Sequence, residues 1–299
     1  MSILSDPQKA LLIVNPVSGK RTIVRSMPDV IRILMDAGFL VTTAVTAESG
    51  DAMAFVSRFG ADYDLIVCAG GDGTLNETVS GLARAGFSVP VGYIPCGSTN
   101  DFAVSRGIST VISEAAADAA TGRPVSYDIG RFEDRYFTYV AAFGAFTSLS
   151  YSTDQNLKNM VGHAAYLMGG LIELSMIHPI PLKVTADGTV FEGDYAFGAV
   201  CNTTSIAGTI SLPDAGIDLC DGQFELMLLH MPQDLIEFEE IVQGLLTKDY
   251  SSPLIEFIQA RSITVESNEE LAWSLDGEES GKHTKVSISV LPGFLTMRQ

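Results

Sequence analysis

The feature that most constrains the fold is a glycine-rich turn between an apolar run and a helical pattern. Residues 64–68 (DLIVC) read as a buried strand. Residues 69–74 (AGGDGT) follow directly, and after them apolar residues recur at helical spacing, at Leu75, Val79, Leu82 and Ala83. The sequence therefore predicts a strand-to-helix turn, which is typical of a sheet covered by helices.

This turn has the composition of an anion-binding loop. Gly70, Gly71 and Gly73 leave the backbone N–H groups accessible, and a helix N-terminus adds a partial positive charge. Asp72 would repel a bare phosphate, so we expect either a divalent cation between them or a substrate proton for Asp72 to accept. A tight turn without a ligand is the structural alternative.

The first part of the chain alternates strands and helices. Apolar runs near 10–14, 41–46, 64–69 and 91–94 predict strands, and the segments between and after them predict helices to about residue 37, at 51–59 and at 111–120. This order specifies a parallel sheet covered on both faces. The loops that begin at Asn15, Gly70 and Gly97 then lie at the carboxyl ends of the strands, where such sheets bind ligands.

The pattern becomes β-rich after about residue 125. Strand-like segments recur at 136–143, 182–185, 195–201, 224–229, 262–266 and 285–290, with helical patterns at 162–177 and 233–246. Asp187-Gly188 between two of these runs is a hairpin signal. We therefore predict an α/β domain over 1–125 and a mainly antiparallel sandwich or open barrel over 126–290, and leave open whether the tail at 291–299 returns to the first domain.

Charge and hydropathy exclude several classes of protein. The net charge of −18 argues against nucleic-acid binding through a basic surface. No apolar run reaches the roughly 18 residues of a membrane-spanning helix, and the N-terminus lacks the pattern of a signal peptide. The four cysteines have no metal-ligand spacing, which favours buried thiols in a reducing compartment. These features predict a soluble cytoplasmic protein.

Two further loops carry polar groups suited to a nucleotide. Residues 15–20 (NPVSGK) lack the spacing of a P-loop, yet Asn15, Ser18 and Lys20 offer an amide, a hydroxyl and a cation beside a helix start. A helix cap at Ser18 is the alternative. Asn100 and Asp101 in the third loop either cap the next helix or bind a substrate or nucleotide.

In this order and spacing, NPVSGK, GGDGTLNE and PCGSTNDFA resemble the diacylglycerol kinase catalytic-domain family, to which sphingosine and ceramide kinases are related. The resemblance continues over essentially the whole chain. Its further elements are 158–166 (KNMVGHAAY), 212–215 (LPDA), 221–224 (DGQF) and 276–278 (DGE).

The resemblance implies an N-terminal domain like that of NAD kinase and phosphofructokinase, a C-terminal β-sandwich, and a site in the cleft between them. It implies catalytic roles for Asp72, Asp276 and Glu278, with Glu278 the usual proton acceptor and the choice between Asp276 and Glu278 left open. It implies a Mg²⁺ site at Asp218, Asp221 and Gln223 that organises Asp72 through water. The ATP-binding residues that it implies are Asn15, Ser18, Lys20, Thr46, Gly70, Gly71, Asp72, Gly73, Thr74, Leu75, Asn76, Ser98 and Asn100.

The leading hypothesis is thus an ATP- and Mg²⁺-dependent lipid kinase that converts diacylglycerol to phosphatidic acid. Such a kinase would meet its lipid by transient association with a membrane. The alternatives are an NAD kinase-like enzyme, which shares GGDGT, and a nucleotide-binding protein without catalysis. The sequence leaves the lipid and the oligomeric state open, a homodimer included.

Overall fold

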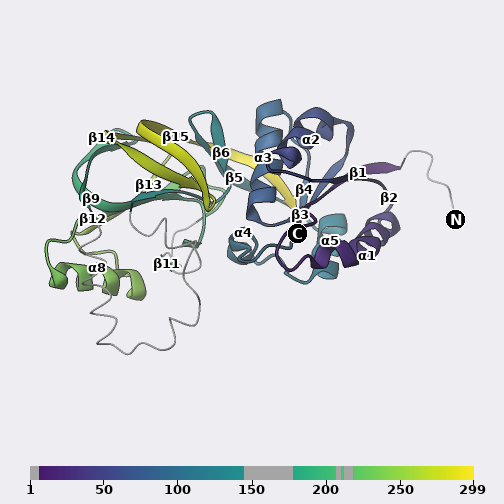
Figure 1. Cartoon of the computed structure of the whole chain (residues 1–299), viewed down its shortest axis with the longest axis horizontal. Helices are drawn as coiled ribbons and strands as arrows, with labels where there is room; N and C mark the ends of the chain where they lie inside the picture. The colour runs from purple at the N-terminus through teal and green to yellow at the C-terminus, as the bar shows by residue number, and fades with distance from the viewer. Residues whose placement is uncertain (1–6, 145–177, 207–209, 212–217) are drawn as a thin grey trace.

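The computed structural model describes residues 7–144, 178–206, 210–211 and 218–299. Two bodies lie side by side, an α/β part that contains the beginning of the chain and a β-rich part (Figure 1). Among the described residues, no helix has both the length and the apolar composition needed to span a bilayer.

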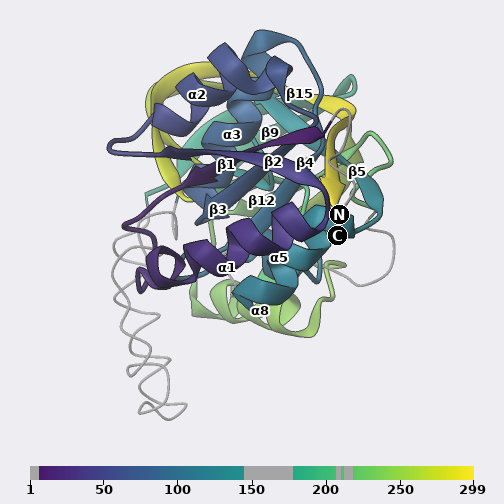
Figure 2. The same cartoon turned by 90° about the vertical axis from the view of Figure 1, so that its right-hand side faces the viewer.

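Four parallel strands form the centre of the first body, in the order β2-β1-β3-β4. They are β1 (Gln8–Val14), β2 (Phe39–Val45), β3 (Leu65–Gly70) and β4 (Val91–Pro95). Helices α1 (Thr22–Asp36) and α5 (Ile112–Thr121) lie on one side of this sheet, and α2 (Asp51–Phe59) and α3 (Asp72–Ala85) on the other (Figure 2). A 3₁₀ turn (Gly60–Asp62) and the short α4 (Asp101–Ser105) complete the connections.

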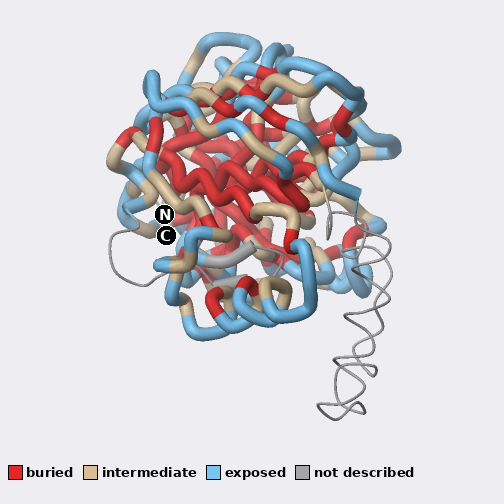
Figure 3. The backbone as a smooth tube through the Cα atoms, turned by 90° about the vertical axis from the view of Figure 1, so that its left-hand side faces the viewer, coloured by how far each residue is buried: buried red, intermediate tan, exposed pale blue. Residues whose placement is uncertain are grey.

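Alternation along β1 explains the two layers of helices. Leu12 packs in one cluster with α1 and α5, whereas Leu11 and Ile13 pack in another with α2 and α3. Because both faces are covered, β3 and β4 are buried along their whole length and β1 is buried from Ala10 on, as the continuous apolar runs predict. In the edge strand β2 only Phe39 is buried. Figure 3, which faces the β-rich part, shows buried strands at the centre of the molecule there as well.

The second body consists mainly of antiparallel strands. They are β5 (Pro124–Phe132), β6 (Arg135–Phe137), β7 (Val140–Gly144), β8 (Ile180–Ala186), β9 (Thr189–Cys201), β10 (Ser205–Ile206), β11 (Ile210–Ser211), β12 (Phe224–His230), β13 (Ile255–Ala260), β14 (Ser262–Leu275) and β15 (Glu278–Arg298). The helix α8 (Leu235–Thr247) follows β12. The long strands β9 and β14 each pair with β7 over one half and with β8 over the other.

Strand β15 connects the two bodies. It pairs with β14 and with β5, and its last residues pair in parallel with β4, Met297 opposite Val91. In Figure 1 this yellow strand runs from the β-rich part into the α/β part. The C-terminal tail therefore extends the sheet of the first body.

Several predicted boundaries differ from the structure. The helix after the glycines begins at Asp72, so Gly70 ends β3 and Gly73 lies in the first turn of α3. Strands β5 and β13 were not predicted, and β15 runs well beyond the predicted 285–290. The predicted helix at 162–177 and the motifs at 158–166 and 212–215 lie outside the described residues. The Asp187-Gly188 hairpin is confirmed, since Ala186 pairs with Thr189.

Candidate functional site

The three loops at the carboxyl ends of β1, β3 and β4 are in contact. Cys96 N–H donates to the Gly70 carbonyl at 2.7 Å. A Cβ on Gly97 would lie 2.8 Å from the Gly71 Cα, and one on Gly19 would overlap the Cys96 carbonyl oxygen. Side chains at these glycines would push the loops apart, so their absence lets the backbones converge on one site.

The predicted nucleotide-binding residues of the first loop lie beside the glycine turn. Asn15 Nδ2 donates to Thr74 Oγ1 at 3.0 Å, and its Oδ1 accepts from Val17 N–H at 3.1 Å. The Thr46 N–H donates to the Val14 carbonyl. Ser18 is buried and Lys20 is exposed. The local cap proposed for Ser18 is not formed, because the N-cap of α1 is Arg21 and no side chain caps it.

Asp72 is turned onto the neighbouring helix. Its Oδ2 accepts from Asp101 N–H at 3.0 Å and its Oδ1 from Phe102 N–H at 3.3 Å, so Asp72 caps α4. Burial raises the pKa of Asp72 to about 6, against the lowering effect of these two bonds. The Asp72 carboxylate thus faces the N-terminus of α4, and it leaves the N-terminus of α3 accessible to an anion.

The side chain of Asn100 hydrogen-bonds to the backbone of the third loop, and it does not cap the helix α4 that follows. Asn100 has a left-handed backbone with φ of 53°; its Oδ1 accepts from Gly97 N–H at 2.8 Å and its Nδ2 donates to the Gly97 carbonyl at 3.1 Å. The cap expected from Asn100 or Asp101 is therefore wrong, because Asp72 supplies it. Ser98 is exposed at the tip of this loop.

Asp276 is buried at the centre of a hydrogen-bond clamp between the two bodies. Its carboxylate accepts from the N–H groups of Thr138 (2.6 Å), Tyr139 (2.9 Å) and Val140 (3.0 Å), and from Thr138 Oγ1 (2.8 Å). It also accepts from Asn76 Nδ2 of α3 at 2.7 Å. Burial raises the pKa of Asp276 despite these bonds. Five donors occupy its oxygens, so Asp276 joins α3 to the 138–140 segment.

Glu278, from the β-rich body, lies at the first turn of α3. A Cβ on Gly73 would overlap Glu278 Oε1, so this carboxylate sits directly over the glycine. Glu278 is exposed, and none of the described residues donates a hydrogen bond to its carboxylate. Partial desolvation and the nearby charges of Glu77 and Asp276 raise its pKa, and Arg135 opposes them. This is a free carboxylate held beside the loop glycines.

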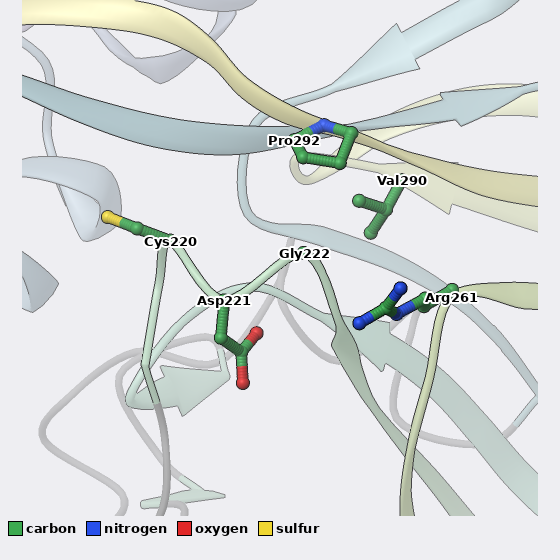
Figure 4. Close-up of a pocket in the computed structure, with 6 residues that line it drawn as sticks. All are labelled: Cys220, Asp221, Gly222, Arg261, Val290 and Pro292. Carbon is green, nitrogen blue, oxygen red and sulfur yellow. The ribbon is translucent and has the colours of Figure 1, made fainter.

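The predicted metal ligands form a short loop before β12. Asp218 Oδ1 accepts from Cys220 N–H at 3.0 Å, and Asp221 Oδ1 from Gln223 N–H at 2.9 Å. Figure 4 shows Asp221 at a pocket of about 310 Å³ that Gly222, Arg261 and Pro292 also line, with its carboxylate turned away from Pro292. Within the described part of the chain, no three His, Cys, Asp or Glu side chains gather as metal ligands.

Sequence comparisons cover both bodies. Residues 9–132 match the model of the diacylglycerol kinase catalytic domain, and residues 142–299 match that of the YegS C-terminal NAD kinase beta sandwich-like domain. A diacylglycerol kinase of Staphylococcus saprophyticus is 34% identical over 296 residues, which are 98% of this chain and 93% of that protein. The chain belongs to the diacylglycerol kinase family. The predicted membership in a family of lipid kinases is thereby confirmed.

Other members of the family agree with this assignment. A diacylglycerol kinase of Staphylococcus aureus is 34% identical over 278 residues, covering 92% of this chain and 87% of that one. The crystal structure of a diacylglycerol kinase from Bacillus anthracis superposes with a TM-score of 0.77, at 27% identity, over 98% of this chain and 97% of the other. The likeness therefore includes the two-domain architecture.

Sequence reasoning missed three residues around this site. Arg135 donates to Ser280 Oγ at 2.9 Å and lies near Glu278. Glu77 accepts from Gly50 N–H at 2.7 Å and Ala52 N–H at 3.1 Å, so it caps α2 although it belongs to the GGDGTLNE motif. Arg106 is buried between the two bodies. No local pattern identifies these residues, because each acts through partners distant in sequence.

We expect Gly73→Ala to lower the activity of this family member by about 10- to 100-fold, because the new methyl group must displace the Glu278 carboxylate. Alanine favours a helix, so the melting temperature should not fall. Steady-state kinetics and thermal melts of Gly73→Ala, Glu278→Gln and the double variant measure this. If Gly73→Ala lowers activity by the same factor in the Glu278→Gln background, the contact between the two residues is not the cause.

Proposed function

We propose that this protein transfers the γ-phosphoryl group of ATP to the free hydroxyl of diacylglycerol, giving phosphatidic acid and ADP in a Mg²⁺-dependent reaction. One observation carries the proposal. The carboxylate of Glu278, which receives no hydrogen bond from the residues that the structure describes, comes from the β-rich body and lies over Gly73 at the N-terminus of α3, where three polar loops converge. The relatives named diacylglycerol kinase support the choice of lipid.

ATP would bind on the α/β body. The first N–H groups of α3 have no partner within the helix, and together with Gly70, Gly71 and Gly73 they suit a phosphate. Lys20 would add a positive charge. The proposed ATP-binding residues are Asn15, Ser18, Lys20, Thr46, Gly70, Gly71, Asp72, Gly73, Thr74, Leu75, Asn76, Ser98 and Asn100. Asp72 would act indirectly here, since its carboxylate fixes α4 and hence the third loop.

Glu278 is the proposed general base. Its raised pKa, and the absence of hydrogen-bond donors to its carboxylate among the described residues, suit a group that accepts the hydroxyl proton. The lipid oxygen forms the new bond to the γ-phosphorus, the bond from that phosphorus to the bridging oxygen breaks, and ADP leaves. Asp276 would position the turn that carries Glu278, since its own oxygens are occupied by donors.

The loop of Asp218, Asp221 and Gln223 would hold Mg²⁺. Its side chains offer the oxygen ligands that Mg²⁺ prefers. The buried Asn202 Oδ1 has no hydrogen-bond partner among the described residues, and Asn202 Nδ2 reaches the Leu219 carbonyl at 3.4 Å, so a polar atom without a described partner lies beside this loop. The oxygen donors of these residues suit a divalent ion, which when bound would supply positive charge to the site.

We propose the same division into domains as the sequence suggested. Residues 1–125 form the nucleotide domain, to which the tail at about 291–299 returns, and residues 126–290 form the substrate and metal domain. The pairing of Met297 with Val91 supports the return of the tail. A lipid substrate requires the enzyme to work at a membrane surface, by transient association.

We expect Asp72→Asn to lower turnover by about 100-fold while the melting temperature at pH 7.5 changes little. Asn loses one acceptor for the α4 N–H groups, but it also removes a buried charge. Because burial raises the folded pKa of Asp72 to about 6, ionised Asp72 destabilises the fold increasingly as pH rises from 3.8 to about 6. Thermal melts from pH 4 to 8 should therefore show a smaller decline with pH in Asp72→Asn. An equal decline in both proteins contradicts this.

One assay tests the function. Purified protein, Mg²⁺ and labelled ATP are offered diacylglycerol in mixed micelles, sphingosine, ceramide or NAD. We expect label in phosphatidic acid, and its loss on chelation of Mg²⁺. Labelled NAD with unlabelled lipid would support an NAD kinase instead, and no transfer to any acceptor would support a non-catalytic nucleotide-binding protein.

A further inference from the structure

A buried guanidinium lies where the two bodies meet. Arg106 follows α4 and is 9% exposed. Its guanidinium carbon lies 3.8 Å from the centre of the Phe102 ring and 4.9 Å from that of Tyr127. Burial lowers the pKa of Arg106 to about 10, so the side chain stays charged at neutral pH. Its surroundings are thus largely aromatic.

This charge has carbonyl partners in place of a carboxylate. Nη2 donates to the Asn202 carbonyl at 2.9 Å and makes a longer contact of 3.5 Å to the Thr138 carbonyl. Nη1 donates to Ser105 Oγ at 2.8 Å, and Nε has no hydrogen-bond partner in the part of the chain that the structure describes. Among the described residues, Arg106 forms no ion pair. A buried cation without a counter-ion is costly, and an apolar side chain would fill such a place at less cost.

One of the carbonyls that Arg106 contacts, that of Thr138, belongs to the segment that holds Asp276, and the other, that of Asn202, is joined to this segment. The Asn202 N–H donates to the Tyr139 carbonyl at 2.9 Å, which joins residue 202 to the 138–140 segment. The Thr138–Tyr139 peptide then has its C=O toward Arg106 and its N–H on Asp276 Oδ1. Because the two groups of a trans peptide point in opposite directions, this peptide is held from both sides.

Asn76, on α3 of the α/β body, makes hydrogen bonds beside the same segment. It donates to Asp276 Oδ2 at 2.7 Å and to the Tyr136 carbonyl at 3.0 Å. Arg106 and Asn76 therefore reach the same strand connection from two elements of the α/β body, α4 and α3. Asp72 caps α4 at its other end, so the position of Arg106 is linked to the third loop.

We propose that Arg106 is a positioning residue that fixes the 138–140 segment, and with it the Asp276–Glu278 turn, relative to the phosphate-binding loops. This inference rests on the proposed function and adds to it the alignment of the two bodies. A positively charged planar group suits the task, because it binds carbonyls on the facing body while it stacks on one aromatic ring of each body, Phe102 and Tyr127.

The test compares Arg106→Met, Arg106→Lys and Arg106→Gln with wild type, and uses Arg84→Met as a matched control on exposed α3 surface. ATP affinity and binding stoichiometry are measured by calorimetry, and kcat is expressed per nucleotide-binding site with diacylglycerol as acceptor. We expect Arg106→Met to lower this kcat by about 10- to 100-fold and to change the Kd for ATP by less than about threefold. Arg106→Lys should recover part of the loss, and Arg84→Met should match wild type.

A purely structural role predicts a different result. Variants would then lose nucleotide-binding stoichiometry and melting temperature while kcat per binding site stayed at the wild-type value, and this would overturn the inference. If Arg106→Met does not fold, Arg106→Lys and Arg106→Gln decide by the same criterion. A wild-type protein that transfers no phosphate would overturn the proposed function and the inference with it, whereas an active wild type with equally active Arg106 variants would overturn the inference alone.

Discussion

Glu278→Gln should abolish most lipid phosphorylation, with kcat lower by about 10²- to 10⁴-fold and ATP binding retained. Glutamine has the size of glutamate and fits over Gly73, but it cannot accept the hydroxyl proton. Because Glu278 is exposed and receives no hydrogen bond from the described residues, the variant should melt at the wild-type temperature. Steady-state kinetics, calorimetric ATP binding and thermal melts together measure this.

The neighbouring Glu279→Gln is the matched control. Glu279 is also exposed and lies one residue further along β15, so its side chain points to the opposite face of the strand. We expect Glu279→Gln to keep wild-type kinetics. Comparable losses in the two variants, or a Glu278→Gln enzyme with undiminished kcat, would show that Glu278 is not the base.

Asp276→Asn should unfold more easily, by about 3 kcal/mol in the free energy of unfolding, and should also lose activity. The clamp presents donors only, from Thr138, Tyr139, Val140 and Asn76. An amide would direct its own NH₂ at some of them, which leaves buried donors unpaired. The melting temperature should fall by roughly 6–12 °C, as measured by calorimetry.

The chain provides a control for this substitution in a second Asp-Gly turn. Asp187-Gly188 has φ values of 46° and 89°, against 48° and 83° for Asp276-Gly277. Asp187 accepts from Arg261 N–H and Ser262 N–H but is exposed, so Asp187→Asn should cost less than about 1 kcal/mol. Equal destabilisation of both variants would mean that the turn conformation, and not the buried clamp, sets the stability.

These two turns show that the sequence predicts a turn but not the burial or the hydrogen-bond partners of its carboxylate. Both are Asp-Gly pairs in the sequence, and both form the turn of a hairpin. Only the assembled structure distinguishes them, because the donors around Asp276 come from residues more than 130 positions away, and from 200 positions away for Asn76. Asp276 differs from Asp187 because it is buried where the two bodies meet and accepts hydrogen bonds from several distant residues.

The contacts of Asp72 likewise could not be predicted from local sequence. The sequence placed a carboxylate in a phosphate-binding turn and required a cation or a proton to explain it. The fold adds a third partner, the N-terminus of α4, because β3 and β4 are adjacent in the sheet and bring their loops together. Local pattern could not predict that contact, since α4 is only five residues long.

The sequence by itself determined the order of strands and helices in the first domain, the hairpin at Asp187-Gly188, the position of the three loops and the family. These follow from periodicity, glycine placement and motif order, which are local properties. The tertiary structure alone decided which carboxylates are occupied and which is free, and that Arg106 lies buried between the two bodies. Hydrogen-bond partners and burial arise only when distant segments pack together, and they separate Glu278, beside Gly73, from Asp276 and Asp72.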